Sequence, residues 1–126
     1  MTSTYFRILG ADLAVFTVSA PPAVNRGSSF SMVDTIGNRG NLASPPTVAR
    51  YYLSVDRTLG ASDKYLGERS VPVLAPRGTS LATTKLDIPA DTSPGDYYVI
   101  AVADAAGQLV EVNEANNFKS FAVTIR

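Results

Sequence analysis

The sequence predicts an all-β domain, an antiparallel β-sandwich of about seven strands. Apolar side chains recur with a period of two rather than 3.6, as expected for strands with one buried face. Val, Thr and Ser are abundant, and such residues suit a pleated, half-buried surface. Gly, Pro and Asn recur at short intervals between the apolar segments, where turns are needed. No segment has a convincing helical period.

The first strand is expected over residues 12–20. Leu13 and Val15 lie in one phase and Phe16 and Val18 in the other, so we expect a bend or bulge midway. A strand with this pattern can still bury one continuous face, because the extra residue resets the alternation.

The second strand is expected over residues 28–38. Its buried face combines apolar residues with Asp34, and a buried carboxylate needs partners. Either a bulge rotates Asp34 away from the core, or backbone amides bind its carboxylate. The apolar residues that share its face are Phe30, Met32 and Ile36.

The third to fifth strands are expected over residues 48–55, 65–71 and 80–88. The third alternates most regularly, which predicts one buried and one outward face. Its inward set is Ala49, Tyr51, Leu53 and Val55. The apolar set of the fifth strand is Leu81, Leu86 and Ile88.

The last two strands are expected over residues 97–103 and 118–125. The first of them is apolar on both faces, with Tyr98, Ile100 and Val102 outward, and it follows a Pro-Gly-Asp-Tyr sequence. Tyr97 in that sequence matches a tyrosine corner, in which the hydroxyl bonds to an upstream loop. The residues expected to face inward are Tyr97, Val99, Ala101, Ala103, Phe121, Val123 and Ile125.

Composition excludes several classes of function. The chain has 126 residues, enough for one domain, and 11 basic residues balance 11 acidic ones. Without Cys or His there is no Cys/His zinc site, no thiolate nucleophile and no Ser-His-Asp triad. The neutral charge argues against nucleic acid as a partner. No apolar run reaches the roughly 20 residues that span a bilayer, so we expect no membrane insertion.

An ordered set of motifs spread along the chain closely resembles the CARDB domain, the cell-adhesion-related domain found in bacteria. The match covers nearly the whole chain from residue 12, with residues 1–11 as a linker. One departure is mild, since Val55 occupies a position where the family usually has Thr. The motifs are Asp12-Leu13, Asn38-Arg39-Gly40-Asn41, Arg50–Asp56, Leu66–Pro72, Ile88-Pro89, Pro94–Tyr98, Ala103-Asp104 and Glu111–Asn117.

The resemblance implies an immunoglobulin-like sandwich with Greek-key topology over residues 12–126. It also implies a non-catalytic structural or adhesion module, usually repeated within larger secreted or surface proteins. We therefore interpret the chain as part of an exported bacterial or archaeal protein, located outside the cell or on its surface. Its partners would be neighbouring modules, a surface protein or a glycan. We expect the isolated domain to be a monomer.

Polar residues gather in two loops and suggest a calcium site. Carboxylates and amides supply the oxygens that calcium prefers, although the spacing is not that of an EF-hand. In the simpler interpretation, these side chains organise turns and no cofactor is bound. The candidate ligands are Asp56, Asp63, Asp104, Glu111 and Asn113.

A second candidate is a surface rather than a loop. The third and sixth predicted strands are neighbours in an immunoglobulin-like sheet, so their outward residues should form one apolar and aromatic strip. Such a strip suits a neighbouring module or a protein partner. If the rings are exposed, it suits a carbohydrate, the alternative function. A loop, residues 5–9 or the stem of Arg50 could instead cover it. The interaction strip consists of Tyr52, Tyr98, Ile100 and Val102.

Overall fold

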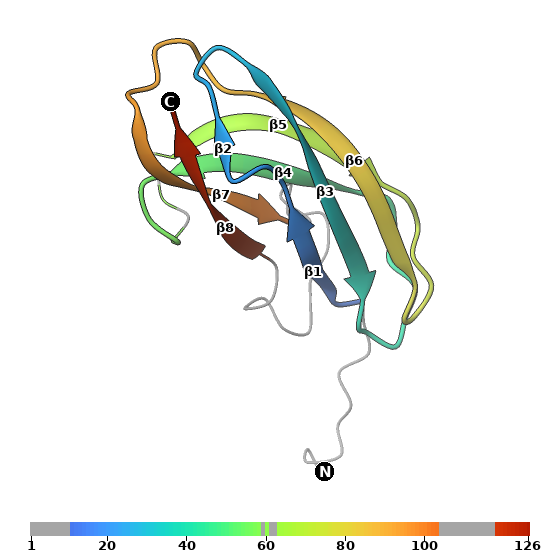
Figure 1. Cartoon of the computed structure of the whole chain (residues 1–126). Helices are drawn as coiled ribbons and strands as arrows, with labels where there is room; N and C mark the ends of the chain where they lie inside the picture. Colours follow the sequence, from blue (N-terminus) through green and yellow to red (C-terminus); the bar gives the residue numbers. More distant parts are fainter. Residues whose placement is uncertain (1–10, 59, 61–62, 104–117) are drawn as a thin grey trace.

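A computed structural model describes residues 11–58, 60, 63–103 and 118–126. These residues form two packed β-sheets, which confirms the predicted all-β sandwich (Figure 1). The smaller sheet has the order β1-β3-β6 and the larger one the order β2-β8-β7-β4-β5. The strands are β1 (Leu13–Ser19), β2 (Ala23–Val24), β3 (Ser29–Asn38), β4 (Thr47–Ser54), β5 (Lys64–Val71), β6 (Thr79–Asp87), β7 (Gly95–Val102) and β8 (Phe118–Ile125).

The described residues form eight strands, where the sequence predicts about seven. The additional strand is β2, which has only two residues and pairs in parallel with β8. A strand this short contains no period that a sequence pattern could reveal. The other seven predicted strands all occur, and β4 and β7 are neighbours as expected.

The core lies between the two sheets and takes one face of each strand. The smaller sheet contributes Leu13, Met32 and Ile36, and the larger sheet contributes Tyr51 and Val99. All five side chains are completely buried. The predicted irregularity of β1 is confirmed, because the register between β1 and β3 shifts between Val15 and Thr17.

Two predicted core residues lie outside the core. Leu81 is 71% exposed, because it and the buried Leu86 are an odd number of residues apart and therefore point to opposite faces of β6. Val55 is 72% exposed, because β4 ends at Ser54. Ile88, the third residue of the β6 apolar set, is buried as predicted.

The predicted tyrosine corner is present. The hydroxyl of Tyr97 donates a hydrogen bond of 2.7 Å to the carbonyl oxygen of Ser93. This bond ties the start of β7 to the loop that precedes it. Gly95 lies between them with φ of +156°.

The described chain enters and leaves at opposite ends of the sandwich (Figure 1). At the entry, the carbonyl of Asp12 accepts a hydrogen bond of 2.8 Å from Arg39, the residue after β3. At the exit, Arg126 bonds through its backbone to Val24 and Arg26, a few residues before β3 begins. The length of β3 therefore separates the two ends. The described residues include no helix that could cross a membrane.

Candidate functional site

The predicted interaction strip lies on the outer face of the larger sheet, the face turned away from the core. Cross-strand pairing places Tyr52 opposite Ile100 and Arg50 opposite Val102. Tyr52, Tyr98 and Val102 are half-buried, but Ile100 has no exposed surface. At Ile100 the strip is therefore covered, which is one of the two outcomes that the sequence left open, and a binding role for the other three residues remains a prediction.

Two tyrosines of this face pack against each other. The rings of Tyr52 and Tyr65 are 5.9 Å apart and inclined by 66°, an edge-to-face arrangement. Tyr65 is 51% exposed. It comes from β5, the edge strand, which the sequence analysis did not include in the strip. The sequence alone gave no signal for it, because a register shift between Tyr51 and Tyr52 is what places Tyr65 opposite Tyr52 in the β4–β5 pairing.

Charged side chains surround these rings. The Arg57 guanidinium lies 4.9 Å from the centre of the Tyr98 ring, a cation–π geometry that covers one face of the ring. Arg50 and Tyr65 both donate to one carboxylate oxygen of Glu68, over 3.1 Å and 2.9 Å. The hydrogen bond from Tyr65, and then that from Arg50, hold the pKa of Glu68 below its usual value.

The two described members of the predicted calcium site organise turns. The Asp56 carboxylate accepts hydrogen bonds from the Ser54 hydroxyl and the Thr58 amide, over 3.1 Å and 3.0 Å. The Asp63 carboxylate accepts one of 2.8 Å from the Gly60 amide. Across the described ranges, no three acidic residues gather as a metal site would require. The other predicted ligands, Asp104, Glu111 and Asn113, lie outside the described residues.

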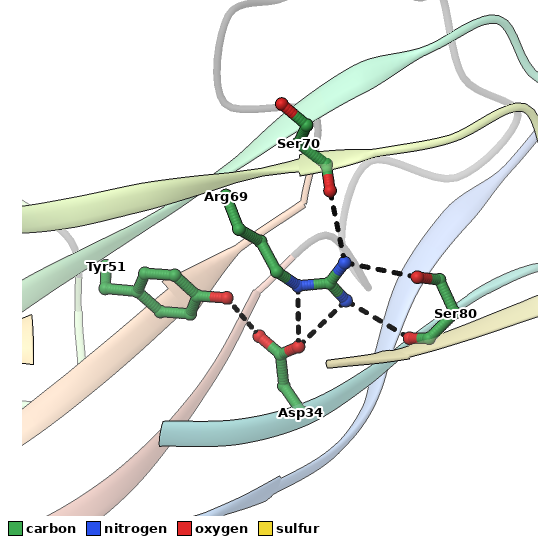
Figure 2. A network of polar contacts seen from close by, with 5 residues as sticks. All are labelled: Asp34, Tyr51, Arg69, Ser70 and Ser80. Carbon is green, nitrogen blue, oxygen red and sulfur yellow. Dashed lines mark hydrogen bonds and ion pairs between the residues drawn. The ribbon is translucent and has the colours of Figure 1, made fainter. Parts of the chain in front are cut away.

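Asp34 lies at the centre of a buried polar network between the sheets (Figure 2). Its carboxylate accepts a hydrogen bond of 2.5 Å from the Tyr51 hydroxyl, and Arg69 forms an ion pair of 2.9 Å with it. Both expectations for Asp34 are therefore wrong: it is fully buried, and side chains rather than backbone amides bind it. Arg69 was missed, because an arginine on an edge strand normally faces solvent.

The network joins both sheets. Asp34 and Ser80 belong to the smaller sheet, and Tyr51 and Arg69 to the larger one. Arg69 also donates to the hydroxyl and the carbonyl of Ser80, over 3.2 Å and 3.1 Å. Burial, and then the hydrogen bond to Asp34, raise the pKa of Tyr51 to about 12. The arrangement is a structural crosslink, since the described partners satisfy each charge.

Comparison with known proteins identifies the family of this chain and structures that share its fold. The model of the CARDB family matches residues 10–121. The CARDB domain of a Pyrococcus furiosus protein, solved in complex with di-metal ions, is 22% identical, with a TM-score of 0.70 and coverage of 95% of this chain and 94% of that one. No curated protein matches the chain.

Two further solved structures share the fold. A domain of a candidate cell surface protein from Methanosarcina acetivorans is 18% identical, with a TM-score of 0.68 and 94% of each chain covered. A β-glucosidase from Listeria innocua is 20% identical over 91% of this chain, with a TM-score of 0.63, but the match covers only 16% of the enzyme. At these identities the similarity establishes the fold.

Proposed function

Because this chain belongs to the CARDB family, we propose that it serves as a non-catalytic spacer module within a larger exported protein. The chain would hold neighbouring modules apart and display them outside the cell. No covalent chemistry is required of it, and its stability comes from the packed core and the polar network between the sheets.

The position of the chain ends is the observation that carries this proposal. The entry beside Arg39 and the exit beside Arg26 lie at opposite ends of β3, a strand of 10 residues. At about 3.4 Å per residue such a strand is roughly 30 Å long. Modules joined end to end through these positions would therefore extend a protein by about that length each.

The solved structures support a modular use of the fold. In the Listeria innocua enzyme, a domain of this fold makes up 16% of the chain. The Methanosarcina acetivorans domain comes from a candidate cell surface protein. A domain of the same fold in this chain would likewise be one part of a longer surface protein.

Small-angle X-ray scattering on proteins with one, two and three tandem copies of the chain tests the spacer function. The maximum dimension should grow by about 35 Å per copy, the length of the sandwich with its turns. A control with the copies joined by a long Gly/Ser linker gives the maximum dimension expected when the copies move independently of one another. Copies that fold back side by side, with little growth in length, would contradict the proposal.

A carbohydrate-binding module remains the alternative. The exposed ring of Tyr65 beside Tyr52 favours it, because aromatic rings stack on sugars. Arg57 over Tyr98 counts against it, since that ring face is already covered. An NMR titration with soluble polysaccharides, comparing the native chain with Tyr65→Ala, would support this alternative only if the shifts on the outer face disappear in the variant.

Cation binding is a further proposal for the acidic loops. The relative from Pyrococcus furiosus was solved in complex with di-metal ions. The described residues alone do not form such a site, because Asp56 and Asp63 already bind nearby amides. Addition of millimolar calcium should shift the NMR signals of the loops and raise the melting temperature. Unchanged NMR signals and an unchanged melting temperature would contradict calcium binding by these loops.

A further inference from the structure

Two arginines lie close together at the entry end of the sandwich. Arg39 directly follows β3, and Arg77 lies in the connection that precedes β6. Both residues are exposed, and their side chains line one pocket with Phe16 and Asn38. Within the described ranges neither guanidinium has an ion pair, whereas two other arginines are each paired with a carboxylate.

The side chain of Asn38 holds the loop that carries Arg39 in place. The side-chain oxygen of the buried Asn38 accepts hydrogen bonds from the amides of Asp12 and Gly40, over 3.0 Å and 2.9 Å. Its side-chain amide donates to the carbonyls of Leu42 and Leu74, over 2.7 Å and 3.1 Å. Because every polar position of this side chain is used, the loop is held in one conformation before any partner arrives.

Each arginine is also held individually. The Arg39 guanidinium lies 5.2 Å from the centre of the Phe16 ring. Arg77 has φ of +67°, a left-handed conformation that favours Gly or Asn, and its amide donates to the carbonyl of Asn38 over 2.7 Å. Among the described residues, Arg77 is the only one other than Gly with a positive φ, a conformation that costs stability for a residue with a Cβ atom.

We propose that Arg39 and Arg77 form a docking site for carboxylates of the module that precedes this one in a tandem array, a module of the same fold. The proposal rests on the spacer function above. Guanidinium groups bind carboxylates through paired, charge-assisted hydrogen bonds. The Arg39 amide bonds to the carbonyl of Asp12, so the pair lies beside the point where the chain enters and faces what precedes it.

The exit end of the same fold offers suitable carboxylates. Asp87, Asp91 and Asp96 are exposed and lie at the end of β6, in the following turn and at the start of β7. Arg26 and Arg126 are exposed at the same end, and neither forms an ion pair with these aspartates within the described residues, so the carboxylates stay available to an arginine of the next copy. Asp96 pairs with Thr124, two residues before the exit. In a head-to-tail tandem these acidic side chains face the two arginines of the next copy. The contact is exposed, so it is weak and sensitive to salt.

A protein with two tandem copies tests the proposal, with the rotational correlation time of each copy measured by NMR relaxation. We expect the copies to tumble together at low salt and separately at high salt. Arg39→Gln in the second copy should uncouple them at low salt. Arg77→Gly should do the same, and it should fold at least as well as the native chain because Gly suits the left-handed backbone.

Lys85→Gln in the second copy is the matched control, because Lys85 is exposed near the exit end of β6, far along the strand from Arg77, and the exit end of the second copy faces no module. It removes one positive charge and should leave the coupling unchanged. The docking site is refuted if the native copies tumble separately at low salt, or if Arg39→Gln and Arg77→Gly leave the coupling intact. The spacer function fails separately, through a maximum dimension that does not grow with copy number.

Discussion

At the scale of single residues, one buried charge pair replaces the crosslink that a chain without Cys cannot make. Asp34 is fully buried, and the Arg69 side chain that neutralises it is 8% exposed. Charges this deep are stable only while each keeps its partner. The network is therefore the place where a single substitution should do most damage.

Arg69→Met should lower the free energy of unfolding by about 3–5 kcal/mol, because it leaves the Asp34 carboxylate buried without its cation. Urea denaturation followed by circular dichroism measures this change. The triple variant Asp34→Leu, Tyr51→Phe, Arg69→Met removes the whole network and should recover most of the loss. If Arg69→Met costs less than about 1 kcal/mol, the ion pair is not what neutralises Asp34.

The same network predicts a dependence on alkaline pH. The pKa of Tyr51 is raised to about 12, against an ordinary value of 10.0. The unfolded chain therefore loses this proton at lower pH than the folded chain, so stability is complete below pH 10 and is lost as the pH rises toward 12. The loss should be up to about 3 kcal/mol, and Tyr51→Phe should lack it. Parallel pH profiles for the native chain and Tyr51→Phe would contradict this assignment.

At the scale of elements, hydrogen bonds outside the main ladders fix where strands begin. The hydrogen bond from Tyr97 to Ser93 sets the start of β7. Backbone hydrogen bonds between residues 22–26 and residues 124–126 attach β2 to β8. These contacts position the loops at the exit end without adding to the core.

Tyr97→Phe should lower the free energy of unfolding by about 1 kcal/mol, the net value of one hydrogen bond. Tyr98→Phe is the matched control, since the Tyr98 hydroxyl has no hydrogen-bond partner among residues that the structure describes. Chemical denaturation of both variants measures the difference. Equal stability of the two variants would mean that the tyrosine corner contributes nothing.

The sequence was informative where a feature is periodic or local. Seven of the strands, the β1 bulge and the tyrosine corner could be predicted, because alternation and turn residues are visible within a few positions. The two-residue β2 has no period, and the partner of Asp34 lies far along the chain at Arg69. The burial of Ile100 could not be decided from the sequence, because alternation assigns a face of the sheet but not what covers that face.

At the scale of the whole molecule, the neutral composition describes the chain poorly. The entry end carries the arginine pair, whereas the exit end carries exposed aspartates together with Arg26 and Arg126, so the two ends have different surfaces although 11 basic and 11 acidic residues cancel overall. A module with two different ends is suited to head-to-tail arrays. β1, β3, β6 and β8 run roughly along the line between those ends (Figure 1), so tension in an array would pull along these strands.

The most direct test of the spacer function is single-molecule pulling on a tandem array held at its two ends. Each module should keep its folded length under tension, because force along β2 and β8 loads their hydrogen bonds together. Each should then unfold in one step of about 350 Å, the extended length of residues 11–126 less the folded span. Thr124→Pro, which removes the amide bonded to Pro22, should lower the unfolding force. Gradual extension without discrete steps would contradict a spacer that holds its length.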